Sequence, residues 1–349
     1  MAEKKKLFDI SWNVSEEEYR ADKALSYSIL AKYERTGFNG LDTLFDKVET
    51  PSLTFGSAVD AIITGGQEEF DSKFMVATFP VIPDSIVKMV KLLFSAHKDR
   101  YSNLTEIPND DIIYLTQEEN YQLNWKPDTR AKVIKEKGFE YYRLLFNAGD
   151  RTILDNNTYG EVLQSVRALK ESEATSKYFA QDNPFDSIER YYQLKFKGTF
   201  NGIEYRNMVD CLYIDHANKT IIPIDLKTSS KPEWDFYKSF IEWNYSTQAR
   251  LYWAIIRQNM DKDDYYKDFK LCNYLFIVVN RKTLTPLVWE YEDTTAEGTL
   301  YYGKHKDIIC RSPFEIGEEL TSYLNNSYKV PIGINECEPN KLNVWLERL

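Results

Sequence analysis

The amino-acid sequence predicts an α/β or α+β fold in which a central mixed β-sheet is flanked by helices. Three observations support this class. Apolar residues recur at helical spacing through the first part of the chain. Short runs rich in apolar and β-branched residues, separated by turn residues, follow from about residue 191. A helical stretch then leads to two more such runs and a helical end, an order typical of helices packed on a sheet.

Helical periodicity marks the segments that precede the strands. The expected helices span residues 15–20, 23–35, 54–63, 87–98, 129–146 and 157–179. Gly65 and Gly66 are expected to close the third of them. Residues 83–180 are therefore predicted to form a mostly helical insertion, with loops such as residues 107–111, inside a single domain that spans residues 1–349.

Patterns of β-branched and apolar residues mark the strands. The expected strands span residues 191–199, 203–208, 207–214, 220–228, 271–280 and 284–291. Asn201 and Gly202 are expected to form the turn of a first hairpin, and one helix over residues 234–258 follows the meander. Residues 185–291 would hold the sheet that carries the candidate site, and residues 295–349 would form a C-terminal helical segment.

Composition excludes some classes of protein. The net charge of −10 does not indicate a non-specific coat for nucleic acid, although a locally basic cleft is compatible with it. No stretch approaches roughly 18 uninterrupted apolar residues, so no transmembrane helix is expected. The N-terminus is charged and lacks the apolar core of a signal peptide, so we expect a cytoplasmic location.

Cysteine and histidine usage bears on metal chemistry. The chain has four cysteines, without a C-x-x-C pair, and three histidines, so a zinc or iron–sulfur site is not indicated. Any metal ion is therefore expected to be a hard one, Mg²⁺ or Mn²⁺, held by Asp and Glu oxygens.

Two aspartates and a lysine are notable in the second hairpin of the meander. If its strands pair about a turn at residues 217–218, Asp210 lies directly across from Asp225. Lys227 projects from the same face, because side chains alternate along a strand. Like charges opposite each other are destabilising, whereas a divalent cation converts that repulsion into a binding site. The spacing predicts half of a metal site with an amine beside it.

Gln248 and Tyr252 lie one turn apart on the helix expected over residues 234–258. Both fall on the flank of its apolar stripe, from which they can reach a polar site beneath the helix. The alternative interpretation is an amphipathic helix with ordinary border residues.

These residues together resemble the PD-(D/E)XK nuclease superfamily. The pattern here is Asp210, then Asp225-Leu226-Lys227, then Gln248-x-x-x-Tyr252. Within the superfamily the chain resembles the RecE-like and lambda-exonuclease-like phage recombination exonucleases. Further likeness lies in Leu25-Ser26-Tyr27-Ser28-Ile29-Leu30, Phe55-Gly56-Ser57-Ala58-Val59-Asp60 and Tyr245-x-x-Gln248-Ala249. The resemblance covers about residues 12–75 and 185–305. It implies a restriction-endonuclease-like core.

The resemblance also implies a third metal ligand. RecE-like members carry histidine where this chain has Asp60, and lambda-type members carry an acid there. The implied ligands are Asp60, Asp210, Asp225 and the carbonyl oxygen of Leu226. One or two Mg²⁺ or Mn²⁺ ions held there would supply electrostatic stabilisation and an activated water.

Catalytic and substrate-binding roles follow from the same resemblance. Asp210 and Asp225 would act through the metal, and Lys227 would orient the attacking water or offset charge in the transition state. Gln248 and Tyr252 would position the lysine, the water or the phosphate. The candidates for holding a terminal phosphate are Ser26, Ser28, Lys32 and Arg35. The alternative for these four is a capped, solvated helix.

Other charged residues have weaker functional interpretations. Glu189 and Arg206 flank the strands that lead to Asp210 and are more typical of structural ion pairs. A basic run next to Trp125 comprises Lys126, Arg130, Lys132, Lys135 and Lys137. It is compatible with a DNA backbone contact, but its interleaved acidic residues are more typical of a solvated face.

The resemblance implies a metal-dependent deoxyribonuclease, an exonuclease on double-stranded DNA ends that works 5′ to 3′ in phage recombination or DNA processing. It also implies a homo-oligomer, in the host-cell cytoplasm if the protein is phage-encoded. The acidic surface makes a single-strand annealing protein a candidate partner, and the absence of a long apolar stretch predicts no membrane association. Two alternatives stay open. One is an endonuclease on branched or single-stranded DNA with the same fold, and the other is an inactive DNA-binding or protein-interaction module.

Overall fold

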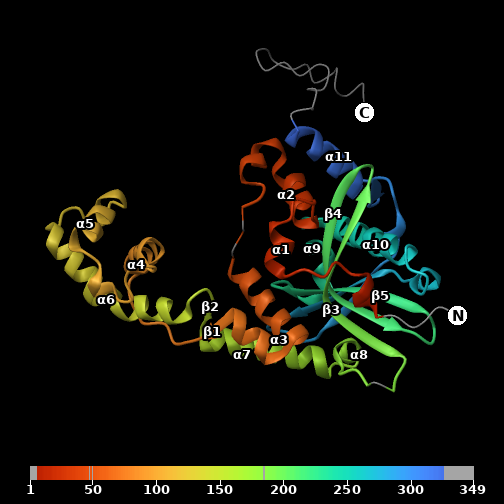
Figure 1. Cartoon of the computed structure of the whole chain (residues 1–349), viewed down its shortest axis with the longest axis horizontal. Helices are drawn as coiled ribbons and strands as arrows, with labels where there is room; N and C mark the ends of the chain where they lie inside the picture. Colours follow the sequence, from red (N-terminus) through yellow and green to blue (C-terminus); the bar gives the residue numbers. More distant parts are fainter. Residues whose placement is uncertain (1–5, 47, 49, 184, 326–349) are drawn as a thin grey trace, which may run out of the picture. The chain divides into compact units, whose positions relative to one another are not determined.

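The computed structural model describes residues 6–46, 48, 50–183 and 185–325 (Figure 1). The chain divides into two compact units. The first comprises Met1–Val48, Ser172–Val279 and Pro286–Leu349, and the second comprises Glu49–Glu171 and Asn280–Thr285. The expectation of one domain over residues 1–349 stays a prediction.

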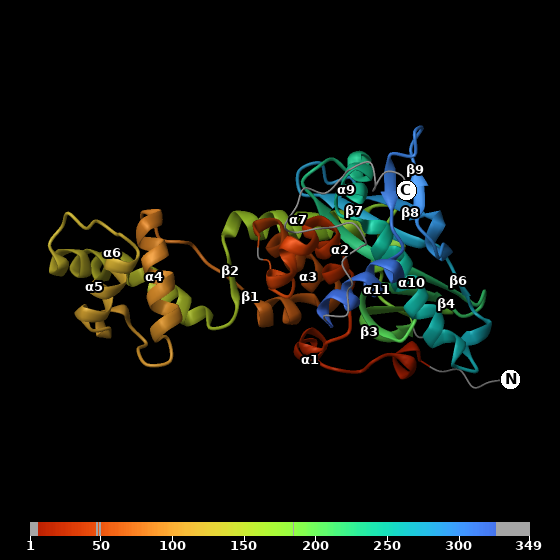
Figure 2. The ribbon, with the colours of Figure 1, turned by 90° about the horizontal axis from the view of Figure 1, so that it is seen from above.

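The first unit is built on a six-stranded sheet. The strand order is β3 (Ile188–Phe200), β4 (Ile203–Asp215), β5 (Thr220–Ser229), β7 (Tyr274–Asn280) and β8 (Leu287–Tyr291), with β6 (Lys270–Leu271) beside β5. β4 runs antiparallel to β3 and β5, and β8 to β7, whereas β5 and β6 are parallel. The sheet is therefore mixed, and helices flank it (Figures 1 and 2). The fold class expected from the sequence is confirmed.

The packing of helix α10 on the sheet sets the orientation of the polar side chains that this helix carries. The α-helices of this unit are α1 (Glu16–Ala21), α2 (Tyr27–Thr36), α8 (Ser176–Phe179), α9 (Phe236–Glu242), α10 (Tyr245–Asp261) and α11 (Pro313–Leu324). Helix α10 packs against β3 and β4, and Figure 2 shows it beside the sheet. It buries Leu251, Ile255 and Ile256 in the main apolar core. Each such side chain contributes roughly 1.5–3 kcal/mol, so this face holds the helix in one orientation.

The structure corrects the single helix expected over residues 234–258. Helix α9 ends at Glu242, and α10 begins at Tyr245. Asn244 between them has a left-handed backbone with φ of 53°, which a continuous right-handed helix does not allow. Because of this break, Gln248 lies in the first turn of α10.

Local turn chemistry forms both hairpins of the meander. Asn201 and Gly202 have φ of 51° and 78°, the left-handed conformations that a tight two-residue turn requires. In the next turn, the Asp215 carboxylate accepts hydrogen bonds from the N–H groups of Ala217 (2.9 Å) and Asn218 (3.1 Å). Both turns expected from the sequence are confirmed.

The segment after β8 differs from the helical segment expected over residues 295–349. It forms the antiparallel hairpin of β9 (Leu300–Tyr302) and β10 (Ile308–Cys310), and only then α11. Gly303, with φ of 87°, allows the chain to turn directly after β9. Residues 326–349 lie outside the described residues, so the rest of the expected C-terminal helical segment stays a prediction.

The second unit is mainly helical. It contains α3 (Pro51–Lys73), β1 (Phe74–Val76), α4 (Asp84–His97), α5 (Asn109–Glu118), α6 (Pro127–Ala148), β2 (Thr152–Leu154) and α7 (Asn156–Glu171). Strands β1 and β2 pair in parallel, and α4, α5 and α6 enclose an apolar core of their own. The backbone of α3 leaves the helical region at Gly66 (φ 74°, ψ −164°), where one helix ends and a second begins. The expectation that Gly65 and Gly66 close the helix is therefore confirmed.

Two boundaries in this part of the chain were predicted wrongly. Helix α5 begins inside the loop expected over residues 107–111, directly after Pro108, whose φ of −55° already suits a helix start. The helix expected over residues 157–179 is divided into α7 and α8, since the chain turns between them.

Among the described residues, the 3₁₀ helices of the two units are η1 (Leu7–Ile10), η2 (Gly37–Thr43), η3 (Leu104–Glu106), η4 (Glu233–Asp235), η5 (Tyr266–Asp268) and η6 (Glu292–Thr295). Within the described ranges, every helix is too short or too polar to span a membrane.

Candidate active site

The register of the second hairpin matches the sequence prediction. Strands β4 and β5 pair Cys211 with Ile224, so Asp210 and Asp225 are the next residues along the two strands. The Asp210 carboxylate reaches across to β5 and accepts a hydrogen bond from the Leu226 N–H through Oδ2, at 2.8 Å. The two aspartates are thus brought to the same end of the β4–β5 ladder.

Asp225, Lys227 and Gln248 form a closed set of polar contacts. Nζ of Lys227 lies 2.6 Å from Oδ2 of Asp225 and donates to Oε1 of Gln248 at 3.1 Å. Nε2 of Gln248 in turn donates to Oδ1 of Asp225. Asp225 and Gln248 are only 3% and 4% exposed, so these contacts form in a region of low dielectric. The structure therefore brings Gln248 of α10 to the carboxylate and the amine of β5.

The Lys227 ammonium is held in its charged form. Burial lowers the pKa of this amine, but the Asp225 carboxylate and the tyrosine hydroxyls of Tyr245 and Tyr27 outweigh burial, so the pKa is raised above its usual value. The stability that this pair contributes is present at neutral pH and is lost only as the pH rises through the alkaline range. Lys227 can consequently act as a fixed positive charge and not as a general base near neutral pH.

Aromatic rings that the sequence analysis gave no role enclose the lysine. Nζ of Lys227 lies 4.5 Å from the centroid of the Tyr245 ring, a cation–π distance. Tyr27 of α2 lies against Tyr245 with ring centroids 6.2 Å apart, and its hydroxyl donates to the Trp243 carbonyl at 2.6 Å. The Tyr245-x-x-Gln248 spacing was a signal for Tyr245, since both side chains stand on one helical turn. No comparable signal identified Tyr27.

Tyr252, the other predicted residue of α10, lies deeper. It is 7% exposed, and burial first, with the nearby carboxylates, raises the pKa of its phenol well above the usual value. It therefore remains a neutral hydrogen-bonding group. Its backbone carbonyl accepts from the side-chain amide of the buried Asn207, at 3.3 Å, which ties α10 to β4 three residues before Asp210.

Strand β3 is distorted opposite Asp210. Its ladder with β4 pairs Tyr192 with Cys211 and Leu194 with Val209, and Gln193 between them has a left-handed φ of 55°. Such a conformation costs about 1–2 kcal/mol for a residue with a side chain. Nε2 of Gln193 lies 3.4 Å from Oδ1 of Asp210. Strain of this kind clusters at functional sites, and no sequence pattern had indicated it.

The four predicted phosphate-binding residues of α2 differ in their surroundings. Ser26, at the N-cap, is 9% exposed and its side chain makes no capping hydrogen bond, whereas Ser28 is exposed. The ammonium of Lys32 donates to the backbone carbonyls of Thr43 and Asp46. The exposed Arg35 guanidinium lies over the Trp243 ring, 5.0 Å from its centroid. Tyr27 of α2 contacts Tyr245 at the start of α10, whose ring in turn contacts Lys227, and the phosphate-binding role of these four residues stays a prediction.

Asp210 and Asp225 supply some, but not all, of the oxygen ligands that a hard divalent cation requires. Mg²⁺ is commonly held by one or two carboxylates, with water and substrate phosphates as further ligands. Asp210 and Asp225 with the Leu226 carbonyl offer oxygen donors of this type on adjoining strands. Asp60 lies half-buried on α3 of the second unit, so its part in one site with them stays a prediction. Among the described residues no cluster of three or more Asp, Glu, His or Cys side chains is placed around a common point.

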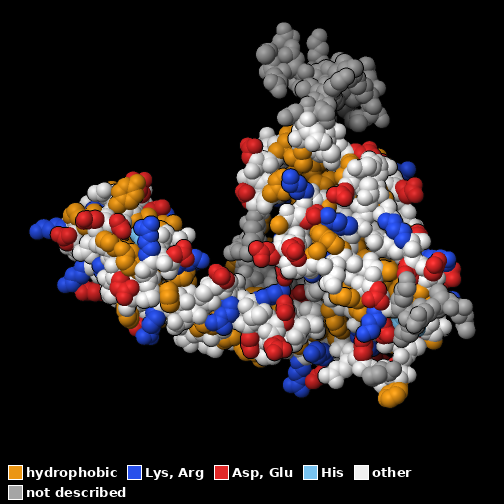
Figure 3. Space-filling view, in the orientation of Figure 1, with side chains coloured by type: hydrophobic (Ala, Val, Ile, Leu, Met, Phe, Trp, Pro, Cys, Tyr) orange, Lys and Arg blue, Asp and Glu red, His pale blue; other side chains and the backbone are white. Residues whose placement is uncertain are grey.

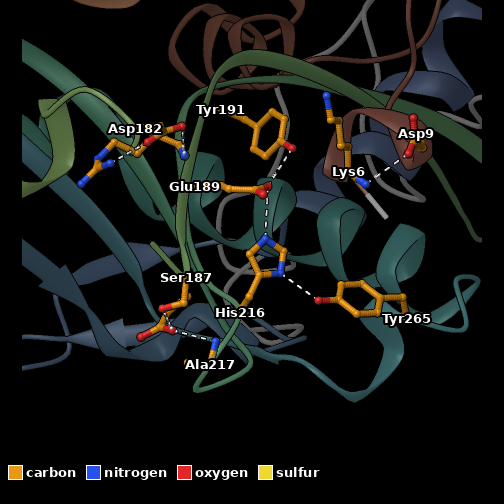
Figure 4. Close-up of polar contacts among 11 residues, drawn as sticks. Lys6, Asp9, Asp182, Ser187, Glu189, Tyr191, His216, Ala217 and Tyr265 are labelled. Atoms are coloured by element: carbon orange, nitrogen blue, oxygen red, sulfur yellow. Dashed lines mark hydrogen bonds and ion pairs between the residues drawn. The ribbon is translucent and has the colours of Figure 1, made fainter. Parts of the chain in front are cut away.

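A second polar cluster lies at the turn end of the β4–β5 hairpin (Figure 4). Oε2 of Glu189 lies 3.1 Å from Nε2 of His216 and accepts a hydrogen bond from the Tyr191 hydroxyl at 2.9 Å. The other ring nitrogen of His216 lies 2.9 Å from the hydroxyl of Tyr265. Arg206, 6% exposed, donates to the Tyr19 carbonyl. Glu189 and Arg206 therefore each connect neighbouring segments of the fold, as expected of structural residues.

The basic run of the second unit is not a continuous DNA-binding surface. Arg130 is only 3% exposed, which removes it from contact with a phosphate backbone. Lys135 donates to the Thr105 carbonyl at 3.1 Å, and Lys132 lies 3.8 Å from Glu136. On the face shown in Figure 3, acidic and basic side chains are interspersed. A solvated helix surface accounts for this run.

Comparison with known proteins does not assign this protein to a family, so its class has to be inferred from the candidate site. No protein-family model and no curated protein matches the chain. The chain is similar to a solved structure provisionally described as an exonuclease from Eubacterium rectale. The sequence identity is 13%, the match covers 96% of this chain and 98% of that chain, and the TM-score is 0.43. A likeness of this degree carries no argument about activity.

Proposed function

We propose that this protein is a Mg²⁺- or Mn²⁺-dependent deoxyribonuclease that hydrolyses DNA phosphodiester bonds. The observation that carries the proposal is the buried contact set of Asp225, Lys227 and Gln248, with the carboxylate of Asp210 on the adjoining strand. A buried lysine whose pKa is shifted by a specific carboxylate partner is a feature that clusters at functional sites.

Each residue of the candidate site has a proposed role in phosphodiester hydrolysis. Asp210, Asp225, the Leu226 carbonyl and Asp60 would hold one or two metal ions, which polarise the phosphoryl group and lower the pKa of a bound water. Lys227, permanently charged at neutral pH, would stabilise the negative charge that develops on the phosphoryl oxygens. Gln248 keeps Lys227 and Asp225 in one orientation through its two hydrogen bonds. Tyr252, buried one turn further along α10, would position the lysine, the water or the phosphate.

The substrate and setting follow from the family resemblance. We propose an exonuclease that degrades double-stranded DNA from its ends, 5′ to 3′, in phage recombination or DNA processing. Ser26, Ser28 and Arg35 would contact the terminal phosphate, since α2 lies beside Lys227 through Tyr27 and Tyr245. Lys32 would take part only after leaving its two carbonyl partners. A homo-oligomer, a single-strand annealing partner and a host-cytoplasmic location belong to the same proposal.

A degradation time course tests the proposal. Purified full-length protein is expected to release nucleotides from a linear duplex in Mg²⁺ or Mn²⁺, to lose this activity in EDTA and to leave a covalently closed circle intact. Labels at either end of the duplex report the polarity. Cleavage of the closed circle would replace the exonuclease by an endonuclease. Binding of the linear duplex without hydrolysis in either metal would indicate an inactive DNA-binding module instead.

A further inference from the structure

A pocket of about 360 Å³ lies in the first unit between α9 and the strands β8, β9 and β10. A volume of this size accommodates a small organic group. Its aromatic lining includes Phe236, Phe240, Phe276, Trp289, Tyr291 and Tyr302. None of the candidate catalytic residues lines this pocket, and its wall rings Phe236 and Phe276 stack on Tyr245, the ring that contacts Lys227.

The aromatic walls form one connected surface. The ring centroids of Phe236 and Trp289 are 6.0 Å apart, those of Phe236 and Phe240 are 6.4 Å apart, and those of Phe240 and Tyr291 are 5.2 Å apart. Aromatic faces carry negative potential and attract cations over distances of about 6 Å. The pocket therefore offers a continuous aromatic wall, which includes the partly exposed ring of Trp289, to a positively charged group.

Acidic residues extend this negative potential to the rim. Glu292 and Asp293 both line the pocket and are exposed, and the Tyr302 hydroxyl donates to the Asp293 carboxylate. Glu290 also lines the pocket, and its carboxylate accepts a hydrogen bond from the neutral amide of Asn273 at 2.8 Å, which leaves its charge in place. Among the described residues, neither lysine nor arginine lines the pocket. The acidic rim of the pocket is therefore complementary in charge to a cation, and it would repel the phosphates of a nucleotide.

The nearest basic side chain on α9 does not neutralise the rim. Lys238 is paired with Asp235 at 2.9 Å, and its ammonium lies 5.5 Å from the centroid of the Tyr237 ring. Tyr237 lines the pocket, so one ring of its wall already interacts with an ammonium group from outside. Trp289 is held by a hydrogen bond from its indole N–H to the Glu233 carbonyl, 3.0 Å, which leaves its ring to contact the ligand.

The neighbouring strand favours a peptide as the source of the cation. Strand β8, which carries Trp289 and Tyr291, is the edge strand of the six-stranded sheet. An edge strand presents backbone N–H and C=O groups with which an extended peptide can pair. A planar guanidinium stacks on aromatic rings and pairs with carboxylates better than an ammonium does. We propose that this pocket binds an arginine side chain of a partner protein whose extended segment lies along β8.

Calorimetric titration of the full-length protein tests this assignment. The probe is an acetylated nonapeptide of glycine, threonine and valine with one central arginine, and its control has citrulline, which is neutral and nearly isosteric. The arginine peptide is expected to bind, and the citrulline peptide to bind about tenfold more weakly or worse, as the loss of cation–π and ionic contacts implies. The double variant Glu292→Gln with Asp293→Asn should bind the arginine peptide about tenfold more weakly.

The matched control is Glu297→Gln, an exposed carboxylate of the same loop that does not line the pocket, and it should leave the affinity unchanged. Asn at position 293 can still accept the Tyr302 hydrogen bond, so the variant is expected to stay folded. Equal affinity for the arginine and citrulline peptides, or no binding of either, would overturn the proposal. So would displacement of the peptide by a thymidine oligonucleotide, which would mark a nucleobase pocket. Free arginine amide binding as tightly as the peptide would refute the part assigned to β8.

Discussion

Lys227→Met is expected to lower the rate of DNA hydrolysis by about 10²–10³-fold, the effect of removing one preorganised donor from a transition state. The reason is that the Lys227 ammonium is the charged group held between Asp225, Gln248 and the Tyr245 ring. The measurement is the initial rate of nucleotide release from a linear duplex in Mg²⁺. Asp225→Asn should reduce the same rate at least as much, since it would remove one of the carboxylates proposed to hold the metal ion.

Folding has to be separated from catalysis in this experiment. Lys227→Met leaves the 3%-exposed Asp225 carboxylate without its cation, and an uncompensated buried charge destabilises by about 3–5 kcal/mol. The double variant Asp225→Asn with Lys227→Met removes both charges and should recover most of that stability without recovering activity. Lys219→Met, at the exposed turn of the same hairpin, is the control for a lost positive charge. A folded Lys227→Met protein with the full rate would refute the catalytic role of this lysine.

Arg250→Met is expected to lower the free energy of unfolding by about 4 kcal/mol, since several charged hydrogen bonds are lost and buried carbonyls lose their donor. Arg250 of α10 is 1% exposed. Its guanidinium donates to the carbonyls of Ala296 (2.8 Å), Cys310 (3.3 Å), Arg311 (3.3 Å) and Gly298. These carbonyls flank the β9–β10 hairpin. Methionine retains the apolar stem but none of the donors.

Urea unfolding followed by circular dichroism measures this change. Arg20→Met is the matched control, because Arg20 is exposed and its ion pair within the described part of the chain is with Glu16 one turn away, a contact worth about 0.3–0.5 kcal/mol. The Arg250 variant should also show faster proteolysis between β8 and α11 than elsewhere, since the loop loses its tether. An unfolding free energy within about 1 kcal/mol of the unsubstituted protein would mean that water replaces the guanidinium at these carbonyls.

Local chemistry explains which parts of the fold could be predicted. The β4–β5 register was predictable because the Asp215 side chain caps its own turn and the flanking residues favour strands. The break at Asn244 and the β9–β10 hairpin were not. Residues 300–310 adopt a hairpin whose flanks are held by Arg250, which is 46 to 61 residues away from its partners in the sequence. Periodicity within a window contains no information about such a partner.

The sequence by itself determined the turn and the strand alternation that bring Asp210, Asp225 and Lys227 to one end of a hairpin. Only the tertiary structure decided that Gln248 and Tyr245 close around the lysine. Their approach depends on how α10 docks on the sheet, and docking is set by apolar contacts summed over many elements. The burial of Arg130 and the strained backbone of Gln193 were decided in the same way, since both depend on neighbours that no local pattern specifies.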